Sequence, residues 1–340
     1  MAAMAVPFCL QEEFMIQAVI LFIAGLLLLI KGGDWFVDGA TGIANRFHIP
    51  EILIGATVVS IGTTLPEVMV SATSAAKGIG AMAYGNAIGS IICNTALISA
   101  ITIAVKPAGV EKKSLRLPVA FFFIAAAVYV LTAYLTGYFS RPVGIVLLAM
   151  FVTYMVVVVR QAFGSQKNSA KVPAETSSET VDEEPLYKDI ILLVVGAACI
   201  AIGANLLVDN GTIIATALGV PASVIALTFV ALGTSLPEFV TAITSLVKGH
   251  GALSLGNVIG ANLFNLVLVS GVSVTIAPFA VPVEKQIAGM NASLVMDIPV
   301  MLFVMLFLTV PALVKGKLYR SQGIILLAVY TLYVVGQFIL

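Results

Sequence analysis

The sequence predicts an all-α polytopic membrane protein whose ten transmembrane helices form two inverted five-helix repeats. Three observations predict this fold class: the composition, the spacing of the apolar segments and an internal repeat. Of the 340 residues, 60% are hydrophobic and 10% are charged, whereas soluble domains average about 25% charged residues. A chain of this composition is expected to lie in a lipid bilayer.

The charge and cysteine patterns exclude several other classes. The formal net charge is zero, and no basic segment is interleaved with aromatic residues, which argues against nucleic-acid binding. Cys9, Cys93 and Cys199 are odd in number and far apart, so neither a disulfide framework nor a zinc site is predicted. No cofactor and no obligate protein partner is indicated either.

Ten segments are apolar enough to cross a bilayer, which takes about 20 helical residues. The first resembles a signal peptide, but Glu12 and Glu13 precede it where such a peptide would be basic. It is therefore retained as a span. The expected spans are 14–30, 49–74, 81–105, 117–139, 143–159, 190–208, 220–247, 252–279, 294–314 and 323–340.

The basic residues predict the orientation, because short cytoplasmic loops collect Lys and Arg. With the N-terminus outside, fourteen of the seventeen basic residues fall in cytoplasmic loops. Only Lys77, Arg141 and Lys285 then lie outside. We therefore expect both termini to be extracytoplasmic and the middle loop to be cytoplasmic.

An internal repeat joins the two halves of the chain. Residues 32–99 align with residues 203–270 at a constant shift of 171, with 28 identities in 68 positions. The densest matches are GTTLPE at 62–67 with GTSLPE at 233–238, and GNAIGS at 85–90 with GNVIGA at 256–261. Outside these motifs, Asp38 coincides with Asp209, and Lys77 coincides with Lys248.

The repeat also predicts the domain organisation. Each copy belongs to a half of five spans, an odd number, so the second copy enters the membrane from the opposite side, as in many secondary transporters. The expected halves are residues 1–163 and 187–340. Residues 164–186 between them are rich in Ser, Lys, Thr and Glu, which predicts a flexible cytoplasmic linker.

Glu67 and Glu238 are the candidate ion-binding carboxylates. Each lies inside an apolar span without a Lys or Arg at the same depth, where an ionised side chain costs about 2.5–3.5 kcal/mol on insertion scales. Steps of three and four residues place hydroxyl side chains on the same helix face as each carboxylate. These hydroxyls belong to Ser60, Thr63, Thr64, Ser71 and Ser74, and to Thr234, Ser235, Thr241 and Ser245.

Pro66 and Pro237 are expected to interrupt the two helices, because an interior proline removes the hydrogen bond to the carbonyl group four residues earlier. The freed carbonyl groups belong to Gly62 and Gly233, and glycine permits local unwinding. Each motif thus offers a carboxylate, hydroxyls and free carbonyls within one turn. Calcium takes six to eight such oxygen ligands.

Asparagines in the second motif extend the candidate site. Their amide groups can either supply neutral ligands or bond neighbouring helices to each other, and both alternatives stay open. Steps of four residues connect Asn86, Ser90 and Asn94 in the first copy, and Asn257, Ala261 and Asn265 in the second.

Four further acidic residues lie near the ends of spans. They are Asp38, Asp209, Asp297 and Glu51. Helix capping or solvation is the role expected of acidic residues at such positions.

The paired G-T-[ST]-L-P-E and G-N-x-[IV]-G-x motifs resemble the two alpha repeats of the cation/calcium exchanger superfamily, and are most similar to those of prokaryotic sodium/calcium exchangers. The resemblance implies a secondary antiporter in the inner membrane of a prokaryote. It would exchange calcium for sodium by sliding its first and sixth spans over the rest. Calcium would bind between Glu67 and Glu238, with the backbone carbonyls of Thr63 and Thr234.

The resemblance also implies sodium sites on either side of the calcium ion. These sites would use Glu67, Glu238, Thr63, Thr234, Ser90 and the backbone around Ser60 and Ala231. The candidate ligand set also includes two hydroxyl residues that share a helix face with the carboxylates, Thr64 and Ser235. It further includes two asparagines of the second motif, Asn94 and Asn265.

Two positions depart from the family pattern. Ala261 stands where the second repeat often has Ser, which removes a hydroxyl group from an implied sodium site. Asn265 stands where family members often carry Asp, so the implied pocket has two carboxylates and not three. Both departures leave calcium binding intact and bear on the number of sodium ions.

A proton-coupled calcium exchanger is the alternative function, because a desolvated carboxyl group can carry a proton in place of a cation. Proton-coupled relatives resemble one another through motifs that lack the Leu-Pro before Glu, whereas this chain has Leu-Pro at 65–66 and 236–237. The sequence therefore favours sodium coupling.

Two other classes fit the sequence less well. A passive channel typically assembles symmetric subunits around a pore, whereas an inverted repeat within one chain favours alternating access. An intramembrane enzyme is not expected, because the spans contain no nucleophile with a base, no paired aspartates and no His-rich metal motif. His48 and His250 both fall in loops.

Overall fold

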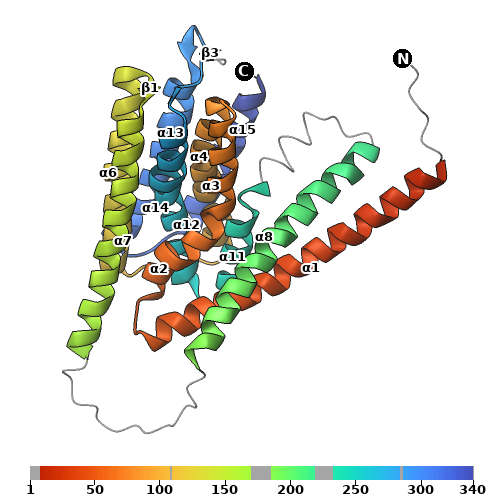
Figure 1. Ribbon diagram of the computed structural model, residues 1–340. Coiled ribbons are helices and arrows are strands. Elements are labelled where there is room, and N and C mark those ends of the chain that lie inside the picture. The colour runs from red at the N-terminus through yellow and green to blue at the C-terminus, as the bar shows by residue number, and fades with distance from the viewer. Residues whose placement is uncertain (1–7, 108, 170–184, 219–232, 284–285, 340) are drawn as a thin grey trace.

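The computed structural model describes residues 8–107, 109–169, 185–218, 233–283 and 286–339, which are almost entirely helical (Figure 1). The first half contains α1 (Phe8–Arg46), α2 (Glu51–Ile54), η1 (Gly55–Val59), α3 (Ser60–Ala76), α4 (Gly80–Cys93), η2 (Asn94–Ser99), α5 (Ala100–Val105), α6 (Lys112–Thr136), β1 (Tyr138–Phe139) and α7 (Arg141–Ser169).

The second half contains α8 (Leu186–Ala217), α11 (Leu236–Val247), α12 (Gly251–Phe264), η4 (Asn265–Val269), α13 (Ser270–Ile276), β2 (Phe279–Ala280), β3 (Gln286–Ile287), β4 (Met290–Asn291), η5 (Ser293–Asp297), α14 (Ile298–Lys315) and α15 (Arg320–Ile339). The η segments are turns of π-helix inside longer helices. Strand β1 pairs with β2, and β3 pairs with β4, both antiparallel.

Eight helical segments in the described ranges are long and apolar enough to cross a membrane. They correspond to eight of the expected spans. Residues 220–232 of the expected span 220–247 lie outside the described residues, and the described remainder contains α11, a helix of 12 residues. The last expected span coincides with α15, which has 20 residues.

Several helices are longer than the sequence predicted, α1 and α7 among them. The first span was expected to end at residue 30, but α1 continues without a break to Arg46. Helix α7 continues to Ser169, six residues into the region expected to be linker (164–169). Glycines inside a helix cost only about 1 kcal/mol each, so Gly32 and Gly33 do not end α1 where it packs against another helix.

Gly33 packs on α11 and Gly32 packs on α8, which lies beside α1 over most of its length (Figure 1). A Cβ atom added at Gly203 would lie 2.7 Å from the carbonyl oxygen of Gly25, and one added at Gly32 would lie 3.0 Å from that of Gly196. Glycines at intervals of seven residues therefore let the two backbones touch, as small residues do between membrane helices. We call this contact the glycine seam.

Helix contacts occur in matching pairs in the two halves of the chain. Gly25 contacts Gly203, and their counterparts Gly196 and Gly32 contact each other as well. Helix α7 packs on α13 through Gly144 and Gly271. In the same way α15 packs on α5 through Gly323 and Ala100, and Ala100 is the counterpart of Gly271.

The central helices are buried, whereas the peripheral helices present apolar surface. The segments Gly80–Val105 and Gly251–Ile276 are mostly enclosed by protein, whereas the most apolar stretches of α1, α7 and α8 are only 22% buried. Leu135 and Leu332 on α6 and α15 are more than two-thirds exposed, at 77% and 72%. Such an exposed apolar surface fits a lipid environment.

The chain begins and ends on one face of the molecule. The start of α1 and the end of α15 lie on the face opposite to the end of α7 and the start of α8 (Figure 1). The second face also carries Lys248, at the turn between α11 and α12. We call it the Lys248 face, and the opposite one, which carries Lys77 after α3, the Lys77 face.

The glycine seam predicts the effect of a single methyl group. Gly203→Ala forces a Cβ atom against the Gly25 carbonyl oxygen, and overpacking of this kind costs about 1–3 kcal/mol. We expect the purified protein to unfold at a lower temperature. Gly85→Ala is the control, because an added Cβ atom there meets no atom within 4 Å. Equal melting temperatures of Gly203→Ala and the parent would contradict the seam.

Candidate functional site

Glu67 of α3 and Glu238 of α11 lie in the middle of the molecule, and both are completely buried at 0% exposure. Their carboxyl groups are close enough to interact electrostatically. None of their four side-chain oxygens has a hydrogen-bond partner among the described residues. Buried polar atoms are normally bonded, so these oxygens are available to a ligand.

The first motif does not unwind as its sequence predicted. Helix α3 is continuous from Ser60 to Ala76 with Pro66 in its interior. The irregularity lies one turn earlier, where η1 forms a π-helical turn and the Ser60 hydroxyl donates to the Gly55 carbonyl oxygen at 2.7 Å. Pro66 removes only one backbone hydrogen bond, the one to the Gly62 carbonyl oxygen, and α3 continues through it.

The second motif is broken, as expected. Thr234 and Ser235 form a turn, and α11 begins at Leu236 with Pro237 in its first turn. Proline is tolerated there because the first backbone N–H groups of a helix have no partner within it. Glu238 also lies in this first turn, where the positive end of the helix dipole favours a carboxylate.

Hydroxyl groups surround the two carboxyl groups. Glu238 lies beside the hydroxyls of Thr63 and Thr64 from the other repeat. The hydroxyls of Thr64 and Ser235 are buried without a hydrogen-bond partner among the described residues, as are those of Thr241 and Ser245. The hydroxyl stripes predicted for both motifs therefore include oxygens that the protein leaves free.

Asn86 and Asn257 bond the two repeats to each other. The Asn257 Oδ1 atom accepts a hydrogen bond from the Thr63 hydroxyl at 3.2 Å. Its counterpart, Asn86 Oδ1, accepts one from the Thr234 hydroxyl at 3.5 Å. The Asn86 amide also donates to the Ser71 hydroxyl at 2.8 Å. Of the two roles left open for these asparagines, their contacts favour helix bonding.

Asn94 and Asn265 differ from those two asparagines. Both are completely buried, and none of their amide nitrogen and oxygen atoms has a hydrogen-bond partner among the described residues. Each begins a π-helical turn, Asn94 in η2 and Asn265 in η4. A buried free amide is costly, so these two side chains are the stronger candidates for ligands.

The remaining candidate ligands are Ser90, Ser60 and Ala231. Ser90 is 5% exposed, and its counterpart Ala261 is completely buried. Ser60 already bonds Asn257, its hydroxyl lying 2.9 Å from the Asn257 carbonyl oxygen. Ala231, which was expected to contribute its backbone, lies outside the described residues.

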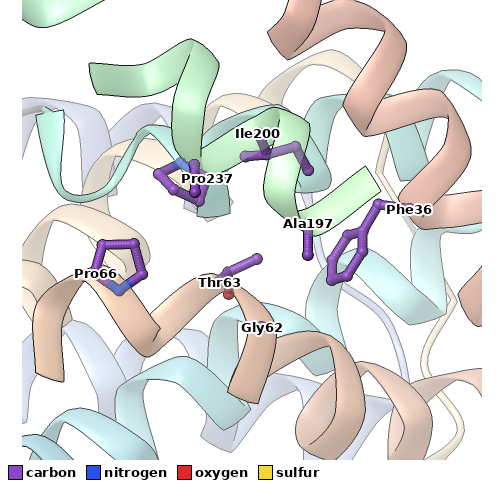
Figure 2. A pocket seen from close by; sticks show the side chains of 8 residues that line it. Phe36, Gly62, Thr63, Pro66, Ala197, Ile200 and Pro237 are labelled. Carbon is purple, nitrogen blue, oxygen red and sulfur yellow. The ribbon is translucent and has the colours of Figure 1, made fainter. Parts of the chain in front are cut away.

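A small cavity lies against the site on the side of α1 and α8. Its volume of about 10 Å³ leaves room for about one water molecule. The prolines of both motifs and Thr63 line it, together with Phe36 of α1 and Ala197 and Ile200 of α8 (Figure 2). Helices α1 and α8 therefore cover the site from this side.

The acidic residues at the span ends have specific partners more often than the sequence predicted. Asp38 is exposed, as expected, and in addition forms an ion pair with Lys248 at 2.7 Å. Glu51 meets the His250 ring nitrogen Nδ1, also at 2.7 Å. Asp297 accepts hydrogen bonds from Tyr333 and Gln337. Asp209 is exposed, as expected.

The sequence analysis missed Asn262. It is completely buried, and its amide donates to the Thr95 hydroxyl at 2.7 Å while its Oδ1 atom has no partner in the described chain. Its counterpart in the first repeat is Ile91, so comparison of the repeats gave no signal. A polar residue inside an apolar span was the signal that could have identified it.

Comparison with known proteins places the chain among membrane exchangers. Residues 17–160 and 188–339 match the sodium/calcium exchanger protein family. The sodium/calcium exchanger MaX1 of Methanosarcina acetivorans is 30% identical over 350 residues, which cover 94% of this chain and 98% of MaX1. The putative antiporter CaxA of Alkalimonas amylolytica is 33% identical over 329 residues, which cover 94% of this chain and 98% of CaxA.

A solved structure of the sodium-calcium exchanger NCX_Mj, soaked with 2.5 mM Na⁺ and 10 mM Sr²⁺, has a TM-score of 0.77 and 31% sequence identity to this chain. The match covers 94% of this chain and 99% of that one. Because family, relatives and structure agree over nearly the whole length, the chain belongs to the sodium/calcium exchanger family.

Proposed function

We propose that the chain is a secondary antiporter that exchanges calcium for sodium across a prokaryotic inner membrane by alternating access. The observation that carries this proposal is the pair of buried carboxyl groups of Glu67 and Glu238, whose oxygens have no partner among the described residues. Family membership supports the same conclusion and argues against an enzyme.

The charge of the site explains why transport would be coupled. Two ionised carboxylates match the charge of one calcium ion, and hydroxyl and amide oxygens complete the shell that calcium prefers. Sodium is also a hard cation and would compete for the same oxygens. An empty site would leave two uncompensated charges in the membrane interior, which is costly. The loaded site therefore changes sides more readily than the empty one.

The same oxygens define the proposed ligand set. Glu67 and Glu238 supply the charge, and Thr63 and Thr234 supply backbone carbonyl groups. The neutral side-chain ligands and the adjoining backbone come from Thr64, Ser235, Ser90, Asn94 and Asn265 and from the chain around Ser60 and Ala231. The free state of the Asn94 and Asn265 amides is the main support for including them.

Ten spans arranged as two inverted repeats are the architecture we propose for alternating access. The paired contacts of Gly25 with Gly203 and of Gly32 with Gly196 support a twofold relation between the halves. The start of α1 and the end of α15 share one face (Figure 1), which supports an even number of crossings. The linker would connect the halves in the cytoplasm.

The moving part is proposed to be the α1–α8 pair. The two helices pack on each other along the glycine seam and cover the cavity beside Thr63. Their outward surfaces are largely exposed and apolar, so lipid would be their neighbour on that side. If the pair slides along the remaining helices, it uncovers the site first on one face and then on the other.

Calcium flux in reconstituted vesicles tests this function. We expect an imposed sodium gradient to drive calcium uptake, and a pH gradient without sodium to have no effect. Glu67→Gln and Glu238→Gln should each abolish uptake, because each removes half of the charge that faces the divalent ion. Glu111→Gln, at an exposed carboxylate that bonds Ser114, is the control. Uptake driven by the pH gradient alone would favour the proton-coupled alternative.

The departure at Ala261 predicts how sodium dependence can be changed. Ala261→Ser restores a hydroxyl oxygen and should raise the apparent sodium affinity, whereas Ser90→Ala should lower it. Loss or gain of one such polar contact corresponds to about a two- to tenfold change. The measurement is the sodium concentration for half-maximal calcium efflux. Identical values in both variants and the parent would show that these positions serve only packing.

The proposed orientation predicts which side of the membrane each segment faces. An epitope tag inserted near Ser169 should be reached by antibody only from the cytoplasm, and tags at the two termini only from outside. The reason is that fourteen of the seventeen basic residues are then on the cytoplasmic side. Tags at the termini that are reached from opposite sides would contradict the even number of spans.

A further inference from the structure

Lys248 ties α1 to the turn between α11 and α12. Its Nζ atom lies 2.7 Å from Asp38 Oδ1 and 3.6 Å from Asp34 Oδ1. It also donates a hydrogen bond to the Asp34 backbone oxygen at 3.0 Å. Both aspartates belong to α1, one turn apart. The contact thus joins the proposed moving pair to the rest of the protein at the Lys248 face.

The internal repeat contains the same residues a second time. At the constant shift of 171, Lys248 corresponds to Lys77, Asp38 to Asp209 and Asp34 to Asn205. Lys77 and Asp209 are both exposed. Neither has an ion pair within the described part of the chain. We call the contacts of Lys248 with Asp34 and Asp38 a lock. This lock is formed here, whereas the counterpart residues Lys77 and Asp209 do not pair in the described part of the chain.

Helix packing shows the same difference between the two faces. At the Lys248 face α1 lies against α11, where a Cβ atom added at Gly33 would lie 2.8 Å from Thr244 Oγ1 and from Val240 Cγ1. The counterparts of Thr244 and Val240 are Thr73 and Met69 of α3. Thr73 is exposed, and Met69 is 65% exposed. Helix α8 therefore leaves uncovered the part of α3 that corresponds to the part of α11 that α1 covers.

We propose that Lys77 and Asp209 form the second of two alternate locks, and that they pair in the conformation opposite to this one. The inference rests on the alternating-access function proposed above. Since α1 and α8 touch along the glycine seam, and Arg46 of α1 also meets Asp189 of α8 at 3.5 Å, the two helices move together. Closing the lock at the Lys77 face then requires opening the one at the Lys248 face.

The two locks are unequal, which sets a bias between the conformations. Lys248 has two carboxylates within reach, whereas Lys77 would meet Asp209 and the neutral Asn205. The carboxylates of Asp34 and Asp38 are 37% and 51% exposed, so the second carboxylate is expected to shift the equilibrium by about two- to fivefold. The lock with two carboxylates favours the conformation seen here.

Two substitutions should weaken this bias from opposite ends. Asp34→Asn removes the additional carboxylate at the Lys248 face, and Asn205→Asp adds one at the Lys77 face. Both should raise the population of the opposite conformation by about two- to fivefold. If Asn205→Asp acts through Lys77, the further substitution Lys77→Gln should abolish its effect, which a merely structural role of residue 205 would not predict.

Spin-label distances measure the two populations in the full chain. Nitroxide labels at Ile79→Cys and Ile213→Cys, two positions that are each 49% exposed, report the approach of α8 to the end of α3. The three native cysteines are first replaced by alanine. Double electron–electron resonance in lipid nanodiscs should then show a larger population at the shorter distance in Asp34→Asn and in Asn205→Asp than in the parent.

Glu51→Gln is the matched control, because Glu51 meets His250 at the same face but does not contact the proposed moving pair through this bond. It should leave the distance distribution unchanged. The proposal is overturned if Asp34→Asn and Asn205→Asp also leave it unchanged, or if Lys77→Gln does not reverse the effect of Asn205→Asp. Calcium flux of the same proteins in reconstituted vesicles separates the proposed function from the locks. A parent without sodium-driven flux contradicts the proposed function, whereas normal flux with unchanged distances contradicts only the locks.

Discussion

Two carboxyl groups in the interior of a membrane protein, without a counter-charge, impose the constraint on which the rest of this structure depends. Glu67 and Glu238 are completely buried, and their oxygens have no partner among the described residues. A buried charge requires compensation, and in an ion carrier the transported ion supplies it. The protein must therefore hold the surrounding oxygens in place without using them in its own hydrogen bonds.

The asparagines show how this requirement is met. Asn86 and Asn257 bond the repeats together through Thr234 and Thr63, so they fix the helices that carry the carboxylates. Asn94 and Asn265, two turns further along the same helical segments, have no partner in the described chain. One pair of amides thus gives rigidity, and the other pair belongs to the ligand set that we propose for the ion. Preorganised ligands of this kind need support from neighbouring residues.

Twofold similarity in sequence does not make the two halves identical in structure. Pro66 lies inside a continuous helix, whereas Pro237 lies in the first turn of α11. Lys248 is paired, and Lys77 is exposed. Differences of this kind are expected of the inverted repeat that we propose, because corresponding elements occupy different states when the protein is open to a single side.

The sequence by itself determined the membrane class, the two carboxylates and the repeat, because apolar length, isolated charge and self-similarity are local properties of the chain. Tertiary structure decided what depends on neighbours. Helix α1 passes Gly32 and Gly33 because α8 packs against the first glycine and α11 against the second. Asn86 bonds Thr234 of the other repeat, whereas Asn94 has no hydrogen-bond partner among the described residues. Asp38 found Lys248 because helix packing brought together residues that are 210 positions apart.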